Sequence, residues 1–158
     1  CGFGRVGRQI ARLLDAADQR WIATDLDSET VEQARKSGLP VFYGDCSRAE
    51  ILRALGVDHA ALVLITLNDV GATERALIAI RQLVPQAGVI ARAHDPAQAH
   101  ALRMHGALRA VPETIEYSLQ FGLAALTELG REAAYRQELE DALRANEYNR
   151  LLTDPPSP

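Results

Sequence analysis

Residues 1–7 read CGFGRVG and place glycines at positions 2, 4 and 7. This G-x-G-x-x-G spacing is typical of a turn between a strand and a helix, where glycines permit a tight turn, close approach to a pyrophosphate and close helix packing. The fingerprint normally follows a strand, whereas here it stands at residue 1. Either the sequence begins inside a longer polypeptide or the match is a coincidence, and the other motifs decide between these interpretations.

Composition narrows the class of protein. With 158 residues, of which 47% are apolar and 24% charged, the chain has the size and composition of one ordinary globular domain. A formal net charge of −4 argues against nucleic acid as a partner. The longest apolar run, residues 60–67, is far shorter than the roughly 18 residues of a membrane helix. Two cysteines without C-x-x-C spacing and four histidines without ligand spacing predict no metal site.

Short apolar runs alternate with helical patterns along the first 112 residues. This alternation predicts an α/β fold with a Rossmann-like, doubly wound parallel sheet, and a strand before the glycines would bring the strands to six. Ser47 and Glu50 have capping-box spacing, and Asp95 precedes Pro96 as a helix start. The predicted strands are residues 21–24, 40–44, 61–67, 88–94 and 107–111, and the predicted helices are residues 5–17, 28–38, 47–56, 68–85 and 95–106.

The pattern changes after residue 112, where two helices, 113–129 and 131–149, follow without a strand between them. The first repeats apolar residues at Ile115, Leu119, Leu123, Leu126 and Leu129. Such a stripe exceeds what one sheet face needs, and it predicts a homodimer interface. We therefore expect a Rossmann-like nucleotide-binding domain with a truncated first strand over residues 1–112, crossover and dimerisation helices over 113–150, and a disordered tail over 151–158.

Asp25 is the strongest companion of the glycine motif. It follows Gly7 by 18 residues, near the spacing of about 20 at which an acid binds the ribose of a dinucleotide. Its carboxylate can accept hydrogen bonds from both ribose hydroxyls and would repel a 2′-phosphate, and the next residue, Leu26, is not an arginine that would bind one. This favours NAD or AMP-type ligands over NADP. The alternative is a solvated loop carboxylate.

Other candidates follow the predicted strands, because ligands of such sheets bind outside the carboxyl ends of the strands. Arg5 lies at a positive helix N-terminus, where it would bind phosphate, or it is a surface arginine. Asp45 and Cys46 lie where an adenine edge is expected, although Asp45 can also support the turn before Ser47. A catalytic role for Cys46 lacks a base nearby in the sequence.

The later strands offer a second group of candidates. Thr66 and residues 68–69 could meet a second half of the ligand, while helix capping explains 68 and 69 equally well. Arg92 and His94 share one strand face; Arg92 is the candidate anion ligand, and His94 is interpreted as a loop residue. Glu113 either caps a helix or faces the cleft. With no nucleophile beside a base and no metal constellation, we expect a nucleotide that is bound and not consumed.

Six ordered motifs resemble the regulatory nucleotide-binding domain of potassium transport proteins, the RCK or KTN domain of TrkA-N type, and the nearest variety is that of Kef-type potassium/proton antiporters. The resemblance runs from residue 1 to about residue 130. It also explains the opening glycines, because in such antiporters the domain follows a transmembrane transport domain. The motifs are CGFGRVG, DLD, YGDCSR, VLITLND, VIARAHD and VPETIEYSLQFG.

The resemblance implies a non-enzymatic domain at the cytoplasmic face of the bacterial inner membrane that forms a homodimer, binds NAD(H) or AMP, and gates an attached antiporter. The alternative is the nucleotide-binding domain of an NAD-dependent oxidoreductase cut from its catalytic domain. One departure is Pro112, since glutathione-gated Kef members have an arginine before the Glu-Thr pair. The predicted cofactor-binding residues are Gly2, Phe3, Gly4, Arg5, Val6, Gly7, Asp25, Leu26, Asp45, Cys46, Thr66 and Arg92.

Overall fold

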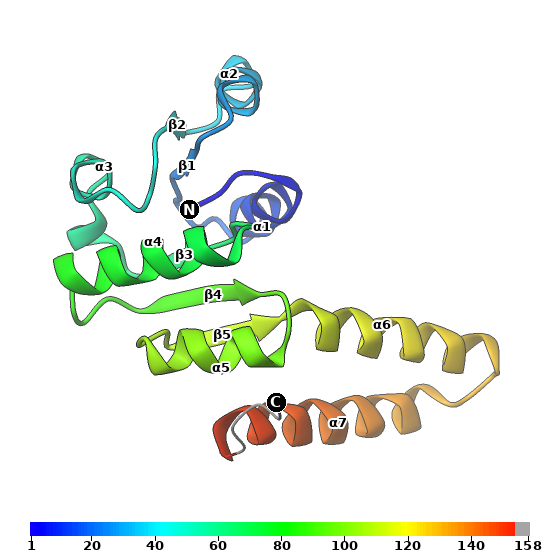
Figure 1. Ribbon diagram of the computed structural model, residues 1–158. Coiled ribbons are helices and arrows are strands. Elements are labelled where there is room, and N and C mark those ends of the chain that lie inside the picture. The colour runs from blue at the N-terminus through cyan, green and yellow to red at the C-terminus, as the bar shows by residue number, and fades with distance from the viewer. Residues whose placement is uncertain (154–158) are drawn as a thin grey trace.

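The computed structural model describes residues 1–153 and has an α/β architecture of short parallel strands alternating with helices (Figure 1). Over these residues five strands form two sheets, one of two strands and one of three, so the expectation of a six-stranded sheet is wrong. The first sheet pairs β1 (Ala23–Asp25) with β2 (Val41–Tyr43). The second has the order β3 (Val63–Ile65), β4 (Val89–Ala93), β5 (Arg109–Pro112).

Residues 1 and 2 lie between the two sheets and bond to both. The Cys1 amine donates to the Leu64 carbonyl over 2.7 Å, and the Thr66 N–H donates to the Cys1 carbonyl over 2.8 Å. On the other side the Gly2 N–H donates to the Thr24 carbonyl over 2.8 Å. This is a parallel ladder, but two residues are too few to count as a strand. They nevertheless bring β1 and β3 to either side of the glycines.

The helices cover two apolar clusters. Phe3, Ala11, Val31 and Val41 belong to the smaller one, which lies under the first two helices; the larger lies between β3–β5 and the helices α3, α4 and α5. The helices are α1 (Arg5–Ala16), α2 (Ser28–Lys36), α3 (Ala49–Ala54), the 3-10 turn η1 (Val57–His59), α4 (Val70–Leu83), α5 (Pro96–Met104), α6 (Glu113–Glu128) and α7 (Ala133–Thr153).

Side-chain caps fix three helix starts. Asp27, Asp69 and Asp95 each accept a hydrogen bond from a backbone N–H in the first turn of α2, α4 and α5, and Pro96 follows Asp95 as predicted. The capping box predicted at Ser47 does not form. The Ser47 hydroxyl donates to Asp45 Oδ1 over 2.7 Å, so α3 begins two residues later, at Ala49, without a side-chain cap.

The two C-terminal helices form a hairpin: α6 continues directly from β5, and α7 runs back beside it to contact α5 (Figure 1). None of the α6 residues is fully buried. The predicted stripe is not an open surface from end to end, because Leu119, Leu123 and Leu126 are half-buried. Leu129, which follows α6, is exposed, and within α6 the large exposed side chains are Tyr117 and Phe121, at 70% and 68% exposure.

The end of the chain differs from the prediction. The helix α7 extends to Thr153, so residues 151–153 are helical, and the rest of the predicted tail, 154–158, lies outside the described residues. Within the part of the chain that is described, no helix combines the length and the apolar character needed to span a membrane.

Candidate nucleotide-binding site

The three glycines of the turn formed by residues 2–7, the glycine turn, differ in what a side chain at their position would meet. Gly2 has φ of +94°, in the left-handed region that other residues rarely adopt. A Cβ on Gly7 would lie 2.3 Å from the Gly2 carbonyl oxygen, so α1 can approach the turn only without a side chain. Gly4 differs, because a Cβ there would meet nothing within 4 Å. The turn is therefore closed at its two ends and open at Gly4.

The N-terminus of α1 adjoins this open position. Gly4 is its N-cap, no side chain caps the helix, and its first turn contains no acidic residue. Arg5 and Val6, the first two helical residues, are exposed. Uncapped N–H groups and the positive end of a helix dipole favour an anion, above all a phosphate. The predicted phosphate site thus has a suitable donor set.

Asp25 ends β1 directly beside the turn. Its Oδ2 accepts the Phe3 N–H over 2.6 Å, and its Oδ1 accepts the Asp27 N–H over 2.9 Å. Each carboxylate oxygen can accept a second hydrogen bond, so these contacts orient Asp25 and leave acceptor capacity for ribose hydroxyls. Leu26 beside it is 58% exposed and offers an apolar surface.

Phe3 anchors the turn in the core. Its ring is buried and stacks on Trp21, with 5.6 Å between ring centroids, and the Trp21 indole N–H donates to Asp15 over 2.7 Å. The Phe3 carbonyl accepts a bond of 3.2 Å from Arg8 Nε. Sequence reasoning missed the role of Arg8, although its place in the first turn after the last glycine is a usable signal.

The loop after β2 is also ordered by its own polar groups. Asp45 Oδ1 accepts the N–H and the hydroxyl of Ser47, and these bonds hold the pKa of Asp45 below its usual range. Thr24 donates to the Gly44 carbonyl over 2.7 Å and ties the loop to β1. Cys46 is buried, and burial raises the pKa of its thiol, as expected for a core residue and not for a nucleophile.

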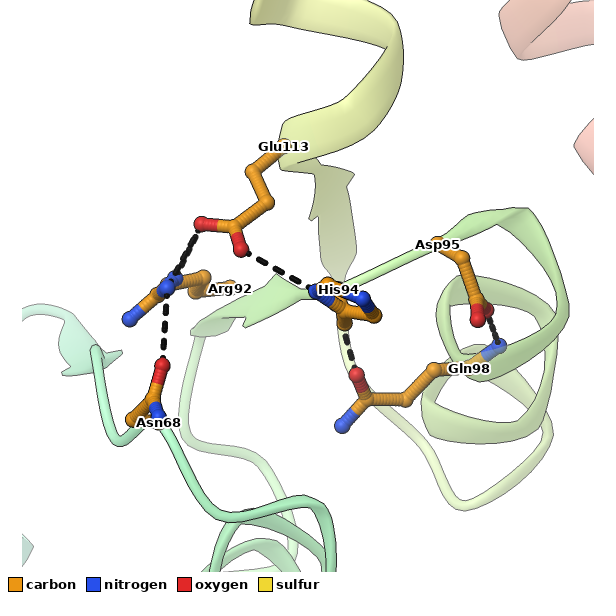
Figure 2. Close-up of polar contacts among 6 residues, drawn as sticks. All are labelled: Asn68, Arg92, His94, Asp95, Gln98 and Glu113. Carbon is orange, nitrogen blue, oxygen red and sulfur yellow. Dashed lines mark hydrogen bonds and ion pairs between the residues drawn. The ribbon is translucent and has the colours of Figure 1, made fainter.

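Arg92 belongs to a second polar group, the Arg92 cluster of Asn68, Arg92, His94 and Glu113 (Figure 2). Its Nε and Nη2 both lie 2.6 Å from Glu113 Oε2, and Nη2 donates to Asn68 Oδ1 over 3.1 Å. His94 Nδ1 lies 3.2 Å from Glu113 Oε1. The Arg92 hydrogen bond, the largest of several causes, lowers the pKa of Glu113.

The structure thus divides the predicted residues. The glycine turn, Asp25 and Thr66 come together, and the Thr66 hydroxyl lies 2.8 Å from the Gly2 carbonyl. Arg92 is instead paired within its cluster, where His94 and Glu113 turn out to be partners. The described residues contain no group of three or more His, Cys, Asp or Glu side chains placed to hold a metal ion.

Parallel strands, alternating helices and a glycine turn between strand position 1–2 and α1 define a Rossmann-like α/β domain. The chain belongs to the TrkA-N domain family, whose family model matches residues 1–113. The resemblance to RCK or KTN domains of TrkA-N type is therefore confirmed.

Relatives agree with this assignment. The chain is 34% identical over 153 residues to the glutathione-regulated potassium-efflux system protein KefC of Cronobacter sakazakii, covering 97% of this chain and 24% of that protein. It is 38% identical over 128 residues to the chloroplastic K(+) efflux antiporter 2 of Arabidopsis thaliana, covering 81% of this chain and 11% of that protein. The chain thus spans a quarter or less of the length of these relatives.

Solved structures show the same fold. The Kef CTD of Shewanella denitrificans in its AMP-bound form superposes with a TM-score of 0.78 at 26% identity, covering 95% of this chain and 91% of that one. The GsuK channel bound to NAD superposes with a TM-score of 0.68 at 23% identity, covering 77% of this chain and 22% of that one. At that identity the second likeness shows the fold alone.

Proposed function

We propose that this chain is a regulatory domain that binds an adenosine nucleotide, AMP or NAD(H), and gates a potassium/proton antiporter to which it is covalently attached at the cytoplasmic face of the membrane. The observation that carries the proposal is the open Gly4 position at the uncapped N-terminus of α1, directly beside Asp25. The AMP-bound Kef CTD and the antiporter relatives support it.

The residues of the turn have separate tasks in this proposal. Backbone N–H groups at the start of α1 bind the phosphate, and the Arg5 guanidinium adds a charge-assisted hydrogen bond. Asp25 accepts the ribose hydroxyls with the lone pairs that Phe3 and Asp27 leave free. The adenine base lies toward Leu26 and the Asp45–Cys46 loop. None of these groups is needed to break a bond, so the nucleotide acts as a signal.

A regulatory domain must pass its state to the rest of the protein. The helix α6 begins at Glu113, whose carboxylate is bonded to Arg92 at the end of β4, so α6 is attached to the edge of the sheet at which ligands of this fold bind. The exposed and stacked Tyr117 and Phe121 rings lie further along α6, with 5.9 Å between centroids. We propose that this face forms a homodimer and carries the response.

Calorimetry of the domain with AMP, NADH and NADPH tests the ligand assignment. We expect AMP and NADH to bind and NADPH to bind at least about tenfold more weakly, because its 2′-phosphate meets the Asp25 carboxylate. Asp25→Ala should weaken AMP and NADH. Asp58→Ala, which removes an exposed carboxylate from η1, is the matched control. Equal affinity of the parent for NADPH and NADH would overturn the role of Asp25.

A further inference from the structure

One peptide group in the glycine turn is held at both of its ends. The carbonyl of Gly2 accepts the Thr66 hydroxyl over 2.8 Å, and the N–H of Phe3, on the other side of the same peptide bond, donates to Asp25 Oδ2 over 2.6 Å. Thr66 directly follows β3 and Asp25 ends β1, so the two side chains come from strands on opposite sides of residues 1–2.

Thr66 also contacts the turn where the glycines lack side chains. A Cβ on Gly2 would lie 3.0 Å from Thr66 Oγ1, and a Cβ on Gly7 would lie 3.3 Å from the same oxygen. The hydroxyl therefore occupies space between the first and third glycines. Its hydrogen lies within reach of a second acceptor, the Cys1 carbonyl at 3.1 Å. Thr66 is thus packed beneath the turn and bonded to its backbone.

We propose that Thr66 is a positioning residue that sets the glycine turn for the phosphate of the nucleotide and does not itself bind the ligand; this inference rests on the proposed nucleotide binding. A peptide plane has one orientation once its C=O and its N–H are both bonded. Fixing the Gly2–Phe3 plane sets the chain direction into Gly4 and the first N–H groups of α1. Donors that are oriented in advance need not be ordered when the anion binds.

The test separates the phosphate from the nucleoside. AMP and adenosine are titrated by calorimetry against the parent, Thr66→Val, Thr66→Ser and a matched control, Thr73→Val. Thr73 of α4 is buried and its hydroxyl donates over 2.9 Å to the carbonyl of Asp69, the N-cap of that helix, so the control removes a comparable bond away from the turn. Thr66→Ala repeats the measurement if the valine variant does not fold.

We expect Thr66→Val to weaken AMP about tenfold, to leave adenosine within about twofold, and to be rescued by Thr66→Ser. The sole tryptophan gives a second readout. Because Trp21 stacks on Phe3, loosening the turn should shift its emission to the red in Thr66→Val and not in Thr66→Ser or Thr73→Val.

The outcomes distinguish the two proposals. A parent domain that binds neither AMP nor NADH refutes the nucleotide site itself. A parent that binds AMP, together with a Thr66→Val variant that binds AMP equally well, refutes the positioning role alone. Equal losses of AMP and adenosine in Thr66→Val also refute it, because they would mean that Thr66 supports the nucleoside or the whole fold.

Discussion

Two helices, α1 and α6, start at the same edge of the sheet region; neither has a side-chain cap, and they differ in the acidic residues of their first turns. The helix α1 begins after Gly4, without a side-chain cap and without an acid in its first turn. The helix α6 begins with Glu113 and has Glu116 in the same turn, and Glu113 is already bonded to Arg92 and His94. Because both helix ends attract anions, the acids of α6 offset the positive end of that helix, whereas α1 has no acid of its own in its first turn. We propose that α1 is the end left open for a ligand.

The contrast extends to the kind of donor. At α1 the donors are backbone N–H groups, and Gly2 and Phe3 just before the helix are held by bonds to Thr66, Asp25 and Arg8. At α6 the donor is a long side chain from β4, that of Arg92, which makes its shortest bonds to Glu113. A rigid open donor set suits recognition, and a paired side chain suits the attachment of one element to another. In the proposed function the glycine turn is therefore the sensing end and the Arg92 cluster the attachment end.

The largest effect is expected from Gly7→Ala compared with Gly4→Ala. The added methyl at Gly7 would lie 2.3 Å from the Gly2 carbonyl, so we expect a loss of stability of about 3 kcal/mol and loss of AMP binding. At Gly4, φ is −69° and the space is open, so stability should stay within about 1 kcal/mol while AMP affinity falls about tenfold or more. Denaturant unfolding measures the stability of each variant, and calorimetry measures its affinity for AMP. Unchanged AMP binding in Gly7→Ala would contradict the closed turn.

The next prediction concerns the helix that the Arg92 cluster attaches. Phe121→Glu places a charge on the exposed aromatic face of α6, and we expect it to weaken a homodimer at least about tenfold in sedimentation equilibrium. Met104→Glu, which changes a 75% exposed apolar side chain on α5, should leave association unchanged. A parent domain that stays monomeric at high concentration would refute the dimer.

A smaller effect is expected from Glu113→Gln. The folded-state pKa of Glu113 is lowered, so its contribution to stability is present above the unfolded value near 4.5 and is lost as the pH falls through the folded value. Because the carboxylate is 36% exposed, we expect a loss below about 1 kcal/mol at pH 7 that disappears at acidic pH. Chemical unfolding across pH, with Glu138→Gln as control, measures this. A stability difference between Glu113→Gln and the parent that persists at acidic pH would exclude the ion pair as its cause. The affinity for AMP should be the same in both.

Local signals predicted much of the fold. The alternation of apolar runs predicted each of the five strands and the helices between them, because burial imposes a period that the sequence must follow. The strand count was wrong because residues 1 and 2 bond as a strand without forming a full one. The start of α3 was wrong because a side chain two residues away, Asp45, competes for the Ser47 hydroxyl, and such competition is not visible in spacing.

The candidate site was predictable where it depends on backbone shape and less so where it depends on pairing. Glycine spacing and the interval to Asp25 located the turn, because both follow from the geometry of a strand-to-helix connection. Arg92 had the right chemistry for an anion, but its partner Glu113 lies 21 residues away on another element. Likewise, Thr66, which is predicted to contact a ligand, donates its hydroxyl to the Gly2 carbonyl, a partner that the sequence does not reveal. Which polar groups satisfy one another is decided by the fold.

The smallest expected effect is that of glutathione, for which we predict none. A glutathione carboxylate needs a cation to replace its water, and bidentate arginine suits that task best. Position 112 is a buried proline with no charge and no N–H, and the Arg92 guanidinium is held by Glu113 and Asn68. A thermal-shift titration with glutathione and a bulky S-conjugate should therefore give no saturable stabilisation, while AMP in the same assay should. Saturable stabilisation by glutathione or its S-conjugate that Arg92→Gln abolishes would show that Arg92 exchanges Glu113 for a ligand, and the distinction between the open and the paired helix end would then fail.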